Sequence, residues 1–202
     1  ANIYLHYAID EWFEKTVKPY CEGEAIMCRY ADDFVCAFRY SRDAERFYEA
    51  LPKRLERFNL QVAEEKTQCM TFSRFKPGLE RRFTFLSFEF YWKDDSKGVP
   101  RVFRRTAQKK QRSTKLELTE FIKKSRHMRT PLLIDKLTTK LQGHYNYFGA
   151  VGNFSSMKMI YDHAVEMLYK WLNRRSGRKS MTWEKLKRVI AYRALAKPWC
   201  TA

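Results

Sequence analysis

Two adjacent carboxylates, Asp32 and Asp33, are the residues of this sequence best suited to chemistry. A pair of acids held at one turn can bind a hard divalent cation, and Mg²⁺ takes one or two protein carboxylates together with phosphate oxygens and water. Two such ions can stabilise the attacking and leaving oxygens of a phosphoryl transfer. The pair alone is weak support, because aspartate is a common turn former and a solvated turn is the simpler interpretation.

The segments on either side of the acid pair predict a β-hairpin. Residues 25–30 and 34–38 are rich in apolar and β-favouring residues, so the acids fall at the bend between two strands. Apolar flanks on both sides predict a buried hairpin, and a buried double-acid bend is costly unless a cation compensates its charge. We therefore favour a metal site over a solvated turn.

The rest of the first hundred residues predicts a mixed arrangement of helices and strands. The spacing of apolar residues predicts a helix over residues 3–13 and another from Ser41 to about residue 58, with Ser41 or Asp43 as its N-cap. Short strands are expected at residues 60–63, 68–72 and 82–92. The order predicts an α+β domain over residues 1–100. Because no N-cap and no initiator methionine precede the first helix, we expect residue 1 to lie inside a helix of a longer protein.

The second half of the chain is strongly basic and has helical periodicity. Residues 1–100 carry 16 Lys/Arg and 17 Asp/Glu, whereas residues 101–202 carry 24 and 6. From about residue 106 the apolar spacing predicts four helices, around residues 116–122, 133–145, 157–172 and 183–190. A basic, all-α domain over residues 101–202 is typical of a module that binds a polyanion, because a merely solubilising charge would mix both signs.

The basic residues expected to bind nucleic acid fall into two groups. The first group is expected to begin the first helix of the basic domain: Arg101, Arg104, Arg105, Lys109, Lys110, Arg112 and Lys115. The second lies in a basic loop: Arg174, Arg175, Arg178 and Lys179. Such a density of cations should neutralise several phosphates and make binding steeply dependent on salt.

The cysteines and the distribution of apolar residues indicate whether the protein has a zinc site and whether it is secreted or membrane-bound. The five cysteines form no C-x-x-C pair and no histidine lies at a ligand spacing from them, so we interpret them as reduced core thiols and not as a zinc site. The sequence has no run of about 18 apolar residues and no signal peptide, which predicts an intracellular protein without a membrane partner.

Several segments together resemble one family. Tyr30-Ala31-Asp32-Asp33 resembles the Y-x-D-D signature of reverse transcriptases. Further similarities follow in the family's order: residues 1–6 to the helix after its Q-G-x-x-x-S-P motif, Leu60 with residues 65–67 to the next palm motif, and residues 85–88 to the F-L-G-F primer-grip strand. Residues 143–149, 171–175 and 182–184 resemble the thumb, or maturase domain, of group II intron-encoded proteins.

The resemblance implies a role for particular residues. Asp32 and Asp33 would be catalytic ligands of two Mg²⁺ ions, and Lys66 would lie near the incoming triphosphate. The nucleotide and primer pocket would include Tyr30, Ala31, Phe85, Leu86 and Ser87. Ser87 replaces the family's glycine, which affects the fit of the primer strand.

The resemblance also implies a fold and an activity. The expected fold is a partial polymerase palm, with a mixed or antiparallel sheet, followed by a helical thumb. The expected activity is RNA-directed DNA polymerisation that uses an RNA template or intron RNA, a DNA primer and dNTPs, in a cytoplasmic protein associated with the nucleoid or a ribonucleoprotein. The family's third metal-binding carboxylate and its fingers would precede residue 1, so we expect the isolated chain to be inactive and to need that missing portion as a partner.

Two alternatives stay open from the sequence. One is a non-catalytic module that recognises structured RNA through its basic domain. The other is an RNA-templated RNA polymerase or a domesticated, defence-associated reverse transcriptase, because these enzymes share the double-acid hairpin.

Overall fold

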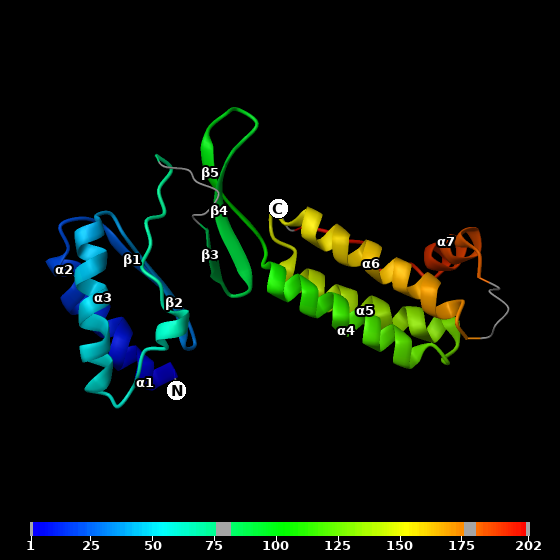
Figure 1. The fold of residues 1–202 in the computed structure, drawn as a ribbon, viewed down its shortest axis with the longest axis horizontal. Coiled ribbons are helices and arrows are strands. Elements are labelled where there is room, and N and C mark those ends of the chain that lie inside the picture. Colours follow the sequence, from blue (N-terminus) through cyan, green and yellow to red (C-terminus); the bar gives the residue numbers. More distant parts are fainter. Residues whose placement is uncertain (1, 76–81, 176–180, 201–202) are drawn as a thin grey trace. The chain divides into compact units, whose positions relative to one another are not determined.

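The computed structural model describes residues 2–75, 82–175 and 181–200, which fall into two compact units (Figure 1). The first unit comprises Ala1–Leu86 with Trp92–Arg101, and the second comprises Ser87–Tyr91 with Val102–Ala202. The elements are helices and small β-sheets, so the expected α+β class is confirmed. The palm and thumb assignments, and the boundary at residue 100, stay predictions. Among the described residues, no helix is both long and apolar enough to cross a lipid bilayer.

The first unit starts with one continuous helical segment over residues 2–20, which confirms and extends the predicted first helix. Its parts are α1 (Asn2–Leu5), η1 (His6–Asp10), η2 (Phe13–Val17) and α2 (Lys18–Tyr20), and η1 and η2 have π-helical hydrogen bonding. π-Helical turns are rare in proteins, and those that occur are often found at functional sites. Asp10 is the last residue of η1.

The predicted hairpin is present. Strands β1 (Ala25–Tyr30) and β2 (Asp33–Phe38) pair antiparallel, with Ala25 opposite Phe38 and Tyr30 opposite Asp33. The loop is therefore only Ala31 and Asp32, and Asp33 belongs to a strand instead of the bend. Ala31 has a φ of 54°, the left-handed geometry that tight two-residue hairpin loops require.

The prediction that the hairpin is buried was wrong for one of its two faces and for its tip. Residues alternate along β1, with Ile26, Cys28 and Tyr30 exposed, and Ala37 in β2 is exposed as well. The physical reason is that successive strand residues point to opposite faces, and only one face of this two-stranded sheet is packed. The acid turn is accordingly exposed, and the cost of burying charge does not apply to it.

Helix α3 (Ser41–Glu56) covers the packed face and supplies the core of the first unit. Its buried residues Phe47 and Leu51 pack with Phe13 of η2, and the Phe13 and Phe47 rings lie 5.8 Å apart, edge to face. Neither predicted N-cap makes a capping bond. Instead, the buried Asp43 accepts the backbone N–H groups of Glu22 and Gly23 at 3.1 and 3.3 Å and so fixes the turn that precedes β1.

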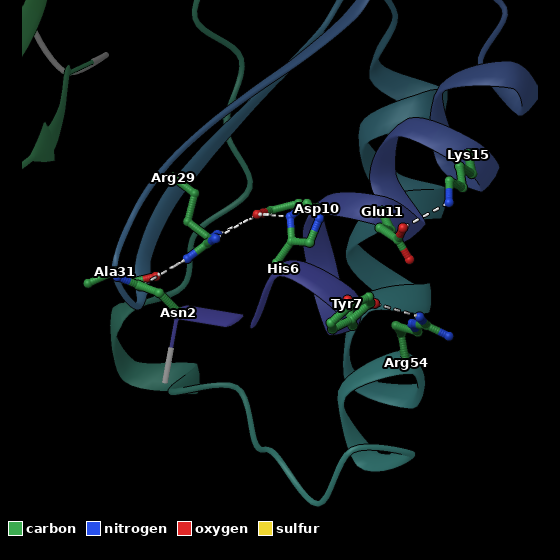
Figure 2. A network of polar contacts seen from close by, with 9 residues as sticks. All are labelled: Asn2, His6, Tyr7, Asp10, Glu11, Lys15, Arg29, Ala31 and Arg54. Carbon is green, nitrogen blue, oxygen red and sulfur yellow. Dashed lines mark hydrogen bonds and ion pairs between the residues drawn. The ribbon is translucent and has the colours of Figure 1, made fainter. Parts of the chain in front are cut away.

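The segment after α3 differs from its prediction. Residues 60–63 and 68–72 form no strand, and between them lies a short 3₁₀ turn, η3 (Glu64–Lys66). β-Favouring residues form a strand only where a neighbouring strand pairs with them. Figures 1 and 2 both show the η3 turn beside the tip of the β1–β2 hairpin.

A second sheet of order β3-β4-β5 replaces the single strand expected at residues 82–92. Its strands are β3 (Arg82–Phe85), β4 (Phe88–Asp94) and β5 (Pro100–Thr106). Leu86 and Ser87 form the loop between β3 and β4, with φ values of 49° and 64°. Positive φ at both loop residues is the type I′ pattern, which usually takes Asn-Gly or Gly-Gly, so its sequence signal is absent here.

The second unit contains the four predicted helices, α4 (Gln108–Ser125), α5 (Thr130–Phe148), α6 (Phe154–Leu172) and α7 (Trp183–Tyr192). Helix α5 supplies Leu133, Leu137, Leu141 and Tyr145 to the core, all fully buried. The apolar spacing of this helix therefore predicted its buried face correctly. Leu116 of α4 is an exception, since 66% of its surface is exposed.

All five cysteines are free thiols, as predicted. Cys21, Cys36 and Cys200 are half-buried and pack against the two cores, whereas Cys28 and Cys69 are exposed, so the interpretation as core thiols was wrong for those two. Burial raises the pKa of the Cys36 thiol to about 12, which keeps that thiol protonated and unreactive at neutral pH.

Candidate metal centre and nucleic-acid interface

The predicted acid pair lies at the tip of the β1–β2 hairpin. Asp32 is the second loop residue, and Asp33 is the first residue of β2, opposite Tyr30. Both acids are exposed, and within the described ranges neither carboxylate has a hydrogen-bond or ion-pair partner. Two unpaired like charges on neighbouring residues repel each other, and a bound cation would relieve that repulsion.

One guanidinium ties this turn to the first helix (Figure 2). Arg29 of β1 donates from Nε to Oδ1 of Asp10 at 2.7 Å and from Nη2 to Oδ2 at 2.5 Å. Its remaining nitrogen, Nη1, donates to the carbonyl oxygen of Ala31 at 2.7 Å. The residue that precedes the acid pair is therefore anchored to η1 through a fork-like ion pair.

The electrostatics of this pair favour its charged form. The hydrogen bond from Arg29 holds the pKa of Asp10 below its ordinary value, and Asp10 raises the pKa of Arg29. The side chains are only 13% exposed for Arg29 and 23% for Asp10, so solvent screens the attraction less than at an open surface. Both carboxylate oxygens of Asp10 accept hydrogen bonds from Arg29, so Asp10 serves the ion pair.

The residues at the turn fit a magnesium ion in part. Two exposed carboxylates supply hard oxygen ligands, and Mg²⁺ usually retains several waters and takes only one or two protein carboxylates. In the part of the chain that the structure describes, no third His, Cys, Asp or Glu joins Asp32 and Asp33 to make a larger ligand cluster.

The other residues predicted around the acids occupy different elements. Lys66 is exposed at the end of η3, the turn that lies beside the hairpin tip. Tyr30 is 66% exposed and stands across the hairpin from Asp33. Phe85 ends β3, while Leu86 and Ser87 form the β3–β4 loop. The pocket that would combine these residues stays a prediction.

Three of the predicted nucleic-acid-binding arginines lie on a strand, not on the first helix of the basic domain. Arg101, Arg104 and Arg105 belong to β5, which the sequence did not predict. Arg101 binds Asp95 at 2.7 Å, Arg105 forms an ion pair with Glu89, and Arg104 stands over the Phe88 ring. The helical placement was wrong because the run of basic residues concealed the alternation of a strand.

The remaining members of that group do lie on the first turns of α4. Lys109 and Arg112 are exposed, and Lys110 and Lys115 are half-buried. An open pocket of about 670 Å³ runs along this side of the helix. Its lining includes Lys109, Arg112, the exposed Leu116 and Glu117. This face is thus basic but not purely cationic.

The second predicted group lies at the end of α6. Arg174 is exposed, whereas the half-buried Arg175 donates to the carbonyl of Met128 at 2.6 Å and to Thr130 Oγ1 at 3.2 Å. Burial lowers the pKa of Arg175. Its contacts tie the loop between α4 and α5 to the end of α6. Arg178 and Lys179 lie outside the described residues.

Arg29 and Asp10 were not predicted as functional residues from the sequence. A signal exists in hindsight, because Arg29 shares its strand face with the half-buried Met27, and a charge on a packed face requires a partner. Asp10 follows Ile9, which is buried in the core of the first unit. The pairing itself joins residues 19 positions apart, so local spacing does not reveal it.

Comparison with protein families gives two matches that follow one another along the chain. Residues 1–91 match the family model of the reverse transcriptase (RNA-dependent DNA polymerase), and residues 111–189 match that of the group II intron, maturase-specific domain. A comparison with curated proteins found no match. The first match contains the acid turn with its Arg29–Asp10 pair, and the second contains most of the helical unit. The chain therefore belongs to the family of group II intron-encoded reverse transcriptases and maturases.

Proposed function

We propose that this chain supplies the acid turn and a nucleic-acid-binding helical unit to an RNA-directed DNA polymerase of a group II intron, and that Asp32 and Asp33 hold Mg²⁺ for nucleotidyl transfer. The observation that carries the proposal is the acid pair itself. It is exposed, it lacks a cationic partner among the described residues, and its turn is anchored through Arg29.

The chemistry divides between the metal and the side chains. Bound Mg²⁺ supplies stabilisation of charge on the reacting phosphate oxygens. Asp32 and Asp33 provide carboxylate oxygens for the metal, and Lys66, from the neighbouring η3 turn, neutralises charge on the incoming triphosphate. Tyr30 and Ala31 line the place where the nucleotide and the primer end meet.

Arg29 and Asp10 act as positioning residues in this proposal. Catalysis by charge stabilisation depends on groups that are held in place before the reaction, and displacements on the order of 1 Å can cost about 10²-fold in rate. The Ala31 carbonyl is bonded to Arg29, and Arg29 is fixed by two bonds to Asp10. This chain of contacts restricts the backbone on which both acids stand.

The isolated chain is proposed to be inactive as a polymerase. The family resemblance implies three metal-binding carboxylates, whereas the described residues offer two at the turn. A centre that lacks one of its charged ligands loses much of its preorganised electrostatic stabilisation. Polymerisation would therefore require the complete intron-encoded polymerase.

Primer extension on an RNA template, with the complete polymerase, tests the proposal. Asp32→Asn and Asp33→Asn should each reduce extension by at least about 10²-fold, because each removes a charged metal ligand. Glu45→Gln, which neutralises an exposed acid of α3, is the matched control and should extend primers as the unchanged enzyme does. Normal extension by both aspartate variants would end the assignment.

A second candidate function is recognition of structured RNA without polymerisation. It is favoured by the excess of 24 Lys/Arg over 6 Asp/Glu in residues 101–202 and by the match to the maturase-specific domain. Filter binding of the chain to a structured RNA over a salt series tests it, with a steep loss of affinity expected as salt rises. The same match favours the intron-encoded class over the defence-associated enzymes that the acid turn alone would allow.

A further inference from the structure

Four cationic groups surround one tryptophan where α4 and α6 end. Lys123 Nζ and Lys170 Nζ lie 5.5 and 5.9 Å from the centre of the Trp171 ring. The guanidinium carbons of Arg126 and Arg174 lie 5.6 and 5.3 Å from the same ring. We call this group the Trp171 cluster. None of its four cations belongs to the residues at the start of α4, and only Arg174 was expected to bind nucleic acid.

The cluster has little acidic compensation. Residues 121–129 and 167–175 carry seven Lys/Arg and no Asp/Glu, and one exposed acid directly precedes each range, Glu120 and Glu166. The nearest acid on α4, Glu120, stands 3.9 Å from Lys124 with both side chains widely exposed, so that contact is weak. Asp135 of α5 is engaged by Arg193 at 2.6 Å. Cations that share one ring repel one another, and a polyanion is the ligand that would relieve this repulsion.

The platform beneath these cations is held in place. Trp171 is only 9% exposed and packs in the core of the helical unit. Arg175 fixes the α4–α5 loop through its bonds to Met128 and Thr130. An open pocket of about 400 Å³ adjoins the cluster, lined by Glu120, Lys123, Lys124, Arg126 and His127. The cations thus sit over a rigid base, while their charged ends reach solvent.

We infer that the Trp171 cluster is a phosphate-binding site for structured RNA, separate from the basic face at the start of α4. Lys109 and Lys123 are 14 residues apart on one helix, which corresponds to about 21 Å. One RNA could therefore contact both sites through different phosphates. The inference rests on the proposed RNA-binding function and names the surface that carries it.

The test compares two double variants that remove equal charge. Lys123→Gln/Lys170→Gln removes half of the cluster and leaves Trp171 in place. Lys158→Gln/Lys187→Gln is the control, since Lys158 is an exposed residue of α6, 13 positions before Trp171, and Lys187 is exposed on α7. Far-UV circular dichroism melting checks that both variants keep the fold. The probe is a fluorescein-labelled RNA hairpin, with fluorescence anisotropy measured over a salt series.

The cluster variant should lose about tenfold in affinity at low salt, and the slope of log affinity against log salt should become shallower by about 1 to 2. In the control variant, the loss of log affinity should be less than about a third of the loss in the cluster variant. Equal losses in the two variants, or no loss in the cluster variant, would overturn the inference. A chain that fails to bind the hairpin at all would instead refute the proposed RNA-binding function.

A DNA hairpin of the same sequence identifies the occupant. Because A-form RNA presents its phosphates differently from B-form DNA, the loss in the cluster variant should be greater on RNA. An identical loss on the DNA hairpin would overturn RNA as the specific ligand of this site.

Discussion

The acid turn of the first unit and the Trp171 cluster of the second are both groups of like charge, and they differ in what holds them. At the turn, two carboxylates stand on a backbone that is held by Arg29 and Asp10. These two side chains carry opposite charges, so their net charge is zero. In the cluster, four cations on long side chains gather over a buried ring.

This difference matches the precision that each proposed task requires. Metal-dependent nucleotidyl transfer needs ligand oxygens at closely defined positions. The short side chains of Asp32, in the anchored loop, and Asp33, at the start of β2, restrict those positions strongly. Phosphate binding on structured RNA tolerates variation in position, since it is largely an electrostatic effect. Lysine and arginine stems can bury their apolar parts against a ring while their charges remain free to move.

The largest expected effect concerns the anchor of the acid turn. A double-mutant cycle with Arg29→Gln and Asp10→Asn should give a coupling energy of about 2 kcal/mol, because each substitution removes one charge of a partly buried, fork-like pair. Hydrogen exchange of the β1 and β2 amides measures this local stability. The pair stabilises the unit above the ordinary carboxyl pKa of 3.8, and this contribution is lost as pH falls through the lowered pKa of Asp10.

The matched control for this cycle is the Lys15–Glu11 pair on the same helical segment. Its atoms lie 2.8 Å apart, but the lysine side chain is 73% exposed. Its coupling should be close to zero, as for most surface ion pairs. If the two cycles gave the same coupling, the claim that the turn is specially anchored would fail.

The next effect is the pH dependence of the stability of the helical unit, which His144 mainly causes. Burial lowers the pKa of His144 to about 4, and its Nε2 is buried without a hydrogen-bond partner among the described residues. The unfolded chain therefore takes up a proton first, and stability should fall by roughly 1 to 2 kcal/mol as pH drops from 7 to 5. Urea unfolding followed by circular dichroism measures the change.

His144→Gln should remove most of this pH dependence. His163, whose pKa is also lowered by burial, should supply the remainder. An unchanged pH dependence in His144→Gln would show that the interior charge is excluded by other groups.

The smallest effect compares the two hairpin loops. Ser87→Gly should stabilise the β3–β4 loop by about 0.5 kcal/mol, because relief of its positive φ exceeds the added freedom of the unfolded chain. Ser96→Gly, in the β4–β5 turn, has no positive φ to relieve and should be neutral or destabilising. Thermal melting distinguishes the two, and a gain in Ser96→Gly alone would contradict the strain argument.

Regular elements with a strong period could be predicted from the sequence, and contacts between distant residues could not. The apolar spacing of Leu133, Leu137 and Leu141 predicted the buried face of α5, since a helix repeats every three or four residues. The hairpin followed from two β-favouring runs around the acids. The exposure of its tip did not, because it depends on which face of the sheet is packed.

The other differences have identifiable causes. Strand β5 was hidden by its arginines, whose partners are Asp95, just after β4, and Glu89 of β4. The loop at Leu86 and Ser87 lacks the glycine that normally marks a type I′ turn. Each of these features depends on tertiary partners or on strain that a local pattern does not contain.

Paramagnetic NMR with Mn²⁺, used in place of Mg²⁺, tests most directly whether the acid turn binds metal. Titration of this chain with Mn²⁺ should broaden the amide signals of residues 30–34 first, and Asp32→Asn/Asp33→Asn should abolish that selective broadening while Glu45→Gln preserves it. Broadening centred elsewhere, or selective broadening that persists in the double variant, would contradict the account.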